Sequence, residues 1–317
     1  MIGACVTESA SLLLSIFIAD LLPIFVIAGI GFLLARYAGV TAPPLARVAF
    51  NALSPCLVFT LLVTSRIGGG DFGRIALFCV LATAASGVVA RLVAVPLHLD
   101  RPARMAFLLV VMFSNSGNYG LPVALLAFGR DALTFASVYF VTSSTLTYTV
   151  GVFLAASGRR SIGIALAGLL RVPTIYAVTL AGVVIATGWP VPAALMQPIE
   201  MLGDAALPLM ILVLGMQLDR ATMPDRPIVV AAAVSISLVI APLLAFAIAG
   251  LLGLTGPAMQ AAVLQASMPA AVVTTILALQ YEIAPSFVTS VVLVSTVLSP
   301  ITLTWLIAFL QHAITVQ

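Results

Sequence analysis

Apolar stretches long enough to cross a lipid bilayer follow one another along almost the whole chain, separated by short polar or Gly/Pro-rich breaks. Only 7% of the 317 residues are charged and 62% are hydrophobic, whereas a soluble domain carries about 25% charged residues. So few charges cannot cover a water-facing surface, and most outward side chains must face lipid. Because the stretches do not alternate polar and apolar residues like the strands of a membrane β-barrel, the sequence predicts an all-α membrane protein.

A spanning helix uses about 20 apolar residues, and the breaks divide the chain into ten segments of that size. We number them spans 1 to 10 in chain order. They fill the chain and leave no room for a soluble domain. We expect them at residues 16–38, 45–65, 73–97, 104–129, 131–156, 169–188, 194–218, 228–252, 258–281 and 285–310.

The arginines predict the orientation of the spans. Ten of them lie in the loops after spans 1, 3, 5 and 7 or at adjacent helix ends, and only Arg66, Arg74 and Arg130 lie in the opposite loops. The positive-inside rule places the richer set in the cytoplasm. We therefore expect a multi-pass protein of the cell inner membrane with both termini outside. The net charge is +3, but the arginines form no cluster beyond Arg159-Arg160, so no nucleic-acid partner is expected.

Two interrupted spans resemble each other across the halves of the chain. Span 2 contains Asn51 and Pro55, and span 7 contains Asp204 and Pro208. Asp204 follows Asn51 by 153 positions, and Pro208 follows Pro55 by the same number. Both prolines are followed by apolar residues. Paired interrupted helices at corresponding positions are the best sequence indication of a transport site.

A second pair of prolines follows the same order. Pro122, where we expect span 4 to break, and Pro269 in span 9 are 147 residues apart. Five spans is an odd number, so a repeat of the first half inserts upside down. We expect two inverted five-helix repeats, residues 1–156 and 157–317, and the alternative is coincidence among Pro-containing helices.

Span 4 carries a polar segment at the depth of the bilayer. Glycine permits unwinding of a helix, proline removes a backbone donor, and freed backbone groups need partners within protein or a wet cavity. Span 9 has a matching set around Pro269, a residue suited to the first position of a new half-helix. The residues that we expect to bind solute are Asn51 as well as Asn115, Ser116, Gly117, Asn118, Tyr119, Gly120, Pro122, Gln265, Ser267 and Pro269.

Two broken helices of opposite direction are expected to cross near the bilayer midplane. Each contributes a helix N-terminus with unpaired N–H groups and about half a positive charge, which suits an anion without any cationic side chain. The sequence therefore favours a small organic anion, such as a carboxylate, as ligand. The alternatives are that span 4 is only a kinked helix whose Asn side chains satisfy its backbone, and that Tyr119 packs instead of lining the pathway.

Asp204 is the acid that we expect inside the membrane, where it binds a proton, faces the solute pathway, or simply caps span 7 near the outer interface. Asp20 and Glu282 lie near span ends and are expected at the interface. No cofactor, metal site or catalytic constellation is expected, since His98 and His312 are isolated and placed in loops.

At several places the chain resembles the auxin efflux carrier family, which includes plant PIN auxin exporters and bacterial malonate-type permeases. The span 4 motif is the most specific, and weaker matches occur in spans 2, 7, 9 and 10. The resemblance covers about residues 15–310. The stretches that carry it are residues 115–122 with Ala127-Phe128-Gly129, residues 50–55, residues 207–216, Met268-Pro269 and Ser299-Pro300.

The resemblance implies the ten-span fold of bile acid symporters and sodium/proton antiporters. Spans 1, 2, 6 and 7 would form a panel that supports a core of spans 3–5 and 8–10, and the core would carry the solute by an elevator-like movement. It also implies a homodimer. No acid lies inside span 9, where bile acid relatives coordinate sodium, so uniport or proton coupling is at least as well supported as sodium coupling. The alternatives are a cation- or bile-acid-type transporter of related fold and a non-transporting receptor.

Overall fold

The computed structural model describes residues 11, 13–65, 69–156, 172–219 and 226–315, and all the regular elements in these ranges are helical. Arg66, Arg159, Arg160, Arg171 and Arg220, which entered the orientation argument, lie outside the described residues. The first half contains η1 (Phe17–Leu21), α2 (Leu22–Ala38), α3 (Ala42–Val48), η2 (Ala49–Leu53), α4 (Ser54–Thr64), α5 (Gly69–Ala94), α6 (Arg101–Met112), η3 (Ser116–Gly120), α7 (Leu121–Leu146), η4 (Thr147–Gly151) and α8 (Val152–Ala155). The second half contains α10 (Pro173–Thr187), α11 (Ala193–Asp204), α12 (Ala206–Leu218), α13 (Pro227–Ser235), η6 (Ile236–Ile240), α14 (Ala241–Leu251), α15 (Gly256–Ala266), α16 (Val272–Gln280) and α17 (Pro285–Thr315).

Seven helices in the described part of the chain are long and apolar enough to cross a membrane. The helices α6, α10, α15 and α16 are not among these seven, and they lie in the predicted spans 4, 6 and 9. α10 is a single apolar helix of 15 residues, while spans 4 and 9 are divided into shorter pieces. The seven helices cover residues 13–38, 42–64, 70–94, 116–155, 193–218, 227–251 and 285–312, and the fourth of them is kinked at Gly129, whose φ is 80°.

Wide π-helical turns precede four of the prolines in the described helices. A proline inside a helix has no N–H to donate, and its ring clashes with the carbonyl one turn earlier. Widening that turn to a π-helix moves the carbonyl away and keeps the rest of the helix intact. The π-turns η1, η2, η3 and η6 end two residues before Pro23, Pro55, Pro122 and Pro242, respectively.

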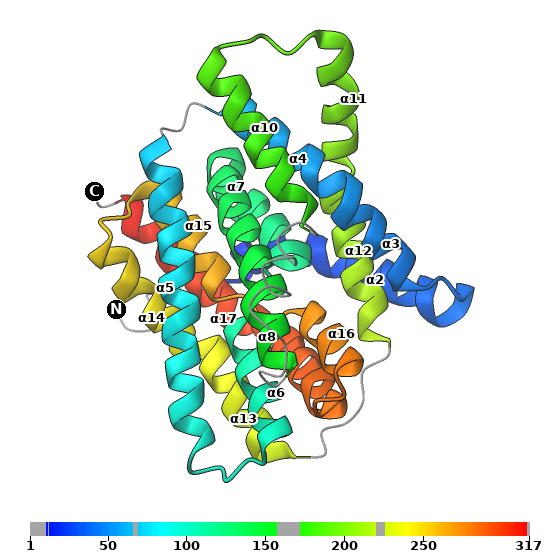
Figure 1. Cartoon of the computed structure of the whole chain (residues 1–317), viewed down its shortest axis with the longest axis vertical. Coiled ribbons are helices and arrows are strands. Elements are labelled where there is room, and N and C mark those ends of the chain that lie inside the picture. The colour runs from blue at the N-terminus through cyan, green and yellow to red at the C-terminus, as the bar shows by residue number, and fades with distance from the viewer. Residues whose placement is uncertain (1–10, 12, 66–68, 157–171, 220–225, 316–317) are drawn as a thin grey trace.

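The helices pack in two groups. In Figure 1, α2, α3, α4, α11 and α12 lie in the right and upper part, and α5, α6, α13 and α14 lie in the left and lower part. In the first, which we call the panel group, α2 packs on α12, and α4 packs on α10 and α11. The second, the core group, comprises α5–α8 and α13–α17, with α7 and α15 in close contact. The groups meet where α12 contacts η3, where α4 contacts α7, and where η1 contacts α7 and α17.

The panel group depends on one crossing of backbone against backbone. A Cβ atom on Gly31 of α2 would collide with the Leu212 carbonyl oxygen of α12, and one on Gly215 of α12 would collide with the Ala28 carbonyl oxygen of α2. Small residues at a helix crossing allow this approach in membrane proteins.

Two ion pairs place three of the arginine-rich loops at the same face of the molecule. Arg36 at the end of α2 lies 3.5 Å from Asp219 at the end of α12. Arg226, which precedes α13, lies 3.6 Å from Asp100, which precedes α6. The loops after spans 1, 3 and 7 therefore share one face, as the arginine distribution predicts.

Candidate functional site

Spans 4 and 9 are both interrupted, and the interruptions pair with each other. The chain is extended between α6 and η3 and again between α15 and α16, and Ser114 forms an antiparallel bridge with Ala270. The Asn115 N–H donates to the Pro269 carbonyl oxygen at 2.7 Å, and the Ala271 N–H donates to the Phe113 carbonyl oxygen at 2.9 Å. Each break thus satisfies backbone groups that the other has freed from its helix. We call residues 113–120 with residues 265–271 the crossing.

Side chains hold the crossing in place from two further directions. The Ser114 hydroxyl donates to the Gln265 carbonyl oxygen at 2.9 Å, which satisfies the C-terminal end of α15. The Ala270 N–H donates to the Ser295 hydroxyl of α17 at 3.2 Å. A kinked but continuous span 4 is therefore excluded, because its backbone leaves the helix and bonds to a distant part of the chain.

The break in span 4 lies earlier than predicted. We expected it at Pro122, but that proline is buried near the start of α7 and continues the helix after the π-turn η3. The extended residues are Phe113–Asn115, and the bridged residues Ser114 and Ala270 are 156 residues apart. The prediction was wrong because a proline at the second position of a helix is accommodated by a wide turn, whereas the actual break is fixed by pairing with span 9.

The π-turn η3 presents its residues to several neighbours. A Cβ on Gly117 would lie 2.7 Å from the Phe140 ring, and a Cβ on Gly120 would collide with the Gln265 side-chain oxygen. Tyr119 is fully buried and packs edge-on against Phe25, with ring centroids 6.2 Å apart. The Ser299 hydroxyl of α17 donates to the Tyr119 hydroxyl at 3.3 Å, so in this conformation Tyr119 packs between α2 and α17.

Two polar atoms at the crossing are buried without a hydrogen-bond partner. They are Nδ2 of Asn115, whose residue is 5% exposed, and Oε1 of Gln265, whose residue is fully buried. Gln265 uses only its Nε2, which donates to the Ala136 carbonyl oxygen at 3.4 Å. A buried amide without a partner costs about 1–3 kcal/mol. This cost marks Asn115 and Gln265 as groups available to a bound molecule.

The other predicted residues of the crossing differ in whether their polar groups have hydrogen-bond partners. The Ser116 N–H donates to the Ser114 carbonyl oxygen at 2.8 Å. Ser267 is buried, and its hydroxyl donates to the Val263 carbonyl oxygen at 2.7 Å. Asn118 is half-buried, and its side chain has no hydrogen bond to any described residue. Asn118 and Asn115 are thus the two side-chain amides on this turn with donors to offer.

The charge at the crossing comes from the backbone. Residues 113–120 and 265–271 contain no ionisable side chain except tyrosine. η3 continues into α7, and α16 starts at Val272, so two helix N-termini begin within a few residues of the bridge. The first turn of each leaves N–H groups without intrahelical acceptors and carries a partial positive charge. The crossing therefore suits a negatively charged group.

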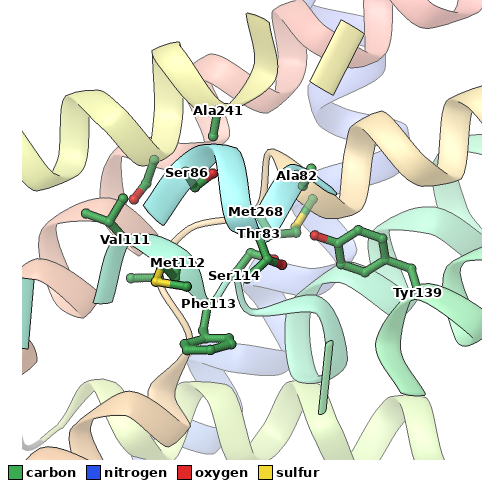
Figure 2. A pocket seen from close by; sticks show the side chains of 13 residues that line it. Ala82, Thr83, Ser86, Val111, Met112, Phe113, Ser114, Tyr139, Ala241 and Met268 are labelled. Carbon is green, nitrogen blue, oxygen red and sulfur yellow. The ribbon is translucent and has the colours of Figure 1, made fainter. Parts of the chain in front are cut away.

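A small cavity lies directly behind the bridge, inside the core group. Its volume is about 10 Å³, and its lining includes Thr83, Ser86, Ser114, Tyr139 and Ser237. Figure 2 shows the Tyr139 hydroxyl directed toward Thr83 and Ser114. This volume holds about one water molecule, whereas pockets for small molecules measure about 300–1,000 Å³. This cavity is therefore too small to hold an organic solute.

Asn51 and Asp204 lie in the panel group, outside the crossing. Asn51 is exposed within η2, and its side chain donates back to the Arg47 carbonyl oxygen at 2.8 Å. Asp204 is exposed at the end of α11, where the chain turns into α12. α11 and α12 both contact η2, and α12 also contacts η3. Among the described residues, neither side chain forms a hydrogen bond or ion pair with a crossing residue, and the roles predicted for both stay predictions.

Asp20, which was predicted at the membrane interface, is enclosed by other parts of the protein, and its depth in the membrane stays a prediction. Its side chain is 9% exposed and is hydrogen-bonded by Gln311, near the other end of the chain. Glu282, the other acid predicted at the interface, is exposed in the turn between α16 and α17. The sequence feature that could have indicated burial of Asp20 is its position among apolar residues just before Pro23, within the π-turn η1.

Comparison with known proteins gives consistent matches along the chain. A family model described as "Membrane transport protein" matches residues 16–165 and 157–307. An "Uncharacterized transporter" of Methanothermobacter thermautotrophicus is 31% identical over 270 residues, which cover 83% of this chain and 87% of that protein. The "Uncharacterized transporter MJ1031" of Methanocaldococcus jannaschii is 26% identical over 200 residues, which cover 61% of this chain and 64% of that protein.

Proposed function

This chain belongs to the membrane transport protein family, the auxin efflux carrier family that its motifs resemble, and we propose that it carries a small organic anion across the membrane at the crossing of spans 4 and 9. The proposal rests on one observation above all. Two helix N-termini meet around a backbone bridge, and the buried Asn115 amide beside them has a donor without an acceptor. An incoming carboxylate supplies the missing acceptor.

The chemistry of the crossing favours a carboxylate over a cation. A cation needs oxygen ligands with negative charge, and the described crossing residues include no aspartate or glutamate. A carboxylate offers acceptor lone pairs to the Asn115 and Asn118 amides and to the N–H groups of η3. Charge-assisted hydrogen bonds of this kind are about twice as strong as neutral ones. Gln265 Oε1, an acceptor, suits a hydroxyl or protonated carboxyl group on the same solute.

We further propose ten spans in two inverted five-helix repeats, with both termini on the outer side of the cell inner membrane. Span 4 consists of α6 and the first part of the long helix 116–155, and span 5 is the rest of that helix after Gly129. Span 6 is α10, span 9 is α15 with α16, and the other six long helices provide the remaining six spans. The ion pairs that place the loops after spans 1, 3 and 7 on one face agree with this layout. In this arrangement the core group moves against the panel group and exposes the crossing to each side in turn. Asp204 and Asn51 then face the path of the solute.

Transport by single-site variants tests the assignment. In proteoliposomes containing the purified protein, Asn115→Ala and Asn118→Ala are each expected to reduce the flux of labelled malonate or indole-3-acetate about 10- to 100-fold. This range corresponds to losing one hydrogen bond to a charged group, about 1.5–3 kcal/mol. Thr179→Ala serves as the control, since Thr179 is exposed on α10 and bonds only within its own helix.

Two results would contradict the proposal in different ways. Unchanged flux in both Asn variants removes the crossing as the binding site. Absence of flux for both acids with the wild-type protein, when the control and wild-type proteins insert equally, removes the substrate class.

A further inference from the structure

Asp20 is the one acidic side chain that is buried in the described part of the chain. It is 9% exposed, whereas the next most enclosed acid, Asp219, has a side-chain exposure of 20% and an arginine partner. Acidic side chains within spanning helices are rare and mark ion or proton pathways. Asp20 is therefore a candidate for a functional residue.

The position of Asp20 joins the panel group to the core group. Asp20 lies in the π-turn η1, at the start of the helix that continues as α2, and η1 contacts α7 and α17. Gln311 of α17 hydrogen-bonds to the Asp20 side chain, and its Nε2 also donates to the Ala127 carbonyl oxygen of α7 at 3.3 Å. One carboxyl group thus connects span 1 to spans 10 and 4 through a single amide.

This connection is close to the crossing along the same helix. Tyr119, whose ring packs on Phe25 of α2, precedes Ala127 by eight residues, a distance of ~12 Å at 1.5 Å per residue. A movement of α2 against α7 therefore affects the Asp20 contact and the crossing together.

The charged neighbours of Asp20 do not pair with it. The ionisable residues on the elements packed against η1 are Arg36 and Tyr37 on α2, Arg130, Asp131 and Tyr139 on α7, and His312 on α17. All of these are exposed except Tyr139, which lies behind the crossing. The three ion pairs formed among the described residues leave Asp20 out. Among the described residues, Gln311 is thus the polar partner of the Asp20 side chain.

We propose that Asp20 binds the proton that drives transport, and that proton binding frees the panel group to move against the core group. The inference rests on the proposed function, because it assigns the coupling ion to the same transport cycle. In the ionised state the carboxylate accepts a charge-assisted hydrogen bond from Gln311, and the bond resists separation of η1 from α17. When a proton adds to a carboxylate oxygen, the charge is cancelled and only a neutral hydrogen bond remains. The neutral side chain crosses an apolar interface at a far smaller cost than the ion.

Concentrative uptake measures this coupling. Proteoliposomes with an acidic exterior are given labelled malonate or indole-3-acetate, and protein-free liposomes correct for passive entry of the acids. The wild-type protein is expected to accumulate the solute above its external concentration. Asp20→Asn is expected to retain equilibrating flux but to lose accumulation, because the amide keeps the shape and cannot carry a proton. Asp131→Asn, an exposed acid on α7, is the matched control.

The outcomes separate the two proposals. If Asp20→Asn still accumulates solute as the wild type does, or if wild-type flux ignores the pH gradient, Asp20 is not the coupling residue and the proposed transport stands. If neither acid moves with the wild-type protein, the proposed function fails, and proton binding is then read by infrared spectroscopy on the purified protein. A carboxylic acid C=O band that titrates in the wild type and in Asp131→Asn but is missing in Asp20→Asn supports the inference, and an unchanged band overturns it.

A second variant covers the case in which Asp20→Asn does not fold. Gln311→Met keeps the volume of the side chain and removes its donor, so the carboxylate loses the bond that favours its charged form. The pH at which uptake is half-maximal, or at which the infrared band is half-formed, is expected to rise. A midpoint equal to that of the wild type would contradict the link between Gln311 and Asp20.

Discussion

Gly120 shows how one missing side chain shapes the crossing. The Gln265 side-chain oxygen occupies the space in which a Cβ atom of Gly120 would stand, and this oxygen has no hydrogen-bond donor. The contact brings the amide of α15 directly against the π-turn η3. Gln265 and Asn115 are therefore held close to the same bridge by packing, while part of the hydrogen-bonding capacity of each stays unused.

Gly120→Ala is expected to displace Gln265 and to reduce both stability and flux. Overpacking of a tight site costs about 1–3 kcal/mol, and the displaced amide no longer faces the bridge. The measurements are thermal unfolding in detergent and malonate flux in proteoliposomes. Gly29→Ala on α2 is the control, because its added Cβ meets nothing within 4 Å and a helical Gly→Ala change is neutral or stabilising. Equal stability and flux in the two variants would argue against a close Gly120–Gln265 contact.

At the scale of the elements, several described helices accommodate a proline by a wide π-turn, whereas spans 4 and 9 leave the helix at two segments that hydrogen-bond to each other. Pro55, Pro122 and Pro242 each follow a π-turn, and the helix continues through them. At residues 113–115 and 267–271 the backbone leaves the helix, and hydrogen bonds between the two segments compensate. The crossing is thus a property of two elements together, and neither segment forms it alone.

The contact between α2 and α12 is expected to be the least tolerant element pair of the panel group. Gly215→Ala places a methyl group against the Ala28 carbonyl of α2, and relief requires the two backbones to move apart. We expect a loss of about 1–3 kcal/mol or more, as for overpacked cores. Thermal unfolding of the purified protein measures it. Gly250→Ala on α14 is the control, because no atom lies within 4 Å of its added Cβ, and its stability should not change. A comparable loss of stability in this control would show that the effect is not specific to the contact between α2 and α12.

At the scale of the whole molecule, the two helix groups are joined by few contacts compared with those inside each group. Phe50 of η2 and Tyr148 of η4 form one aromatic contact between the groups, with ring centroids 5.6 Å apart. Phe246 of α14 and Phe309 of α17 form another contact inside the core group, at 5.2 Å. The cavity lined by Ser114 and Ala270 has room for about one water molecule.

Chemical crosslinking distinguishes movement between groups from movement within one. In a protein whose native cysteines are replaced, a short bifunctional thiol reagent is applied to Phe50→Cys/Tyr148→Cys and to Phe246→Cys/Phe309→Cys. The first crosslink is expected to abolish malonate flux, because it ties the panel group to the core group, and the second is expected to leave most of the flux. Equal flux after both crosslinks would contradict transport by relative movement of the groups.

The sequence by itself determined that this chain is a helical membrane protein, where most of its helices begin and end, and that two polar segments interrupt the apolar pattern. α2 ends at Ala38, α12 ends at Leu218 and α17 begins at Pro285, all at the predicted boundaries. These properties follow from hydrophobicity and from the backbone chemistry of proline and glycine, which act between neighbours in the chain. They also support membership of a transporter family, because its motifs consist of the same residues.

Only the tertiary structure decided where span 4 breaks, that Tyr119 is buried, and which acid lies inside the protein. The break lies at Ser114 because Ala270 pairs with it, and Asp20 is buried because η1 lies between α7 and α17, where Gln311 bonds to it. Each of these depends on residues more than a hundred positions away in the chain. The sequence shows which polar side chains and backbone groups need hydrogen-bond partners within apolar segments. Which partners they find depends on how distant helices pack against each other.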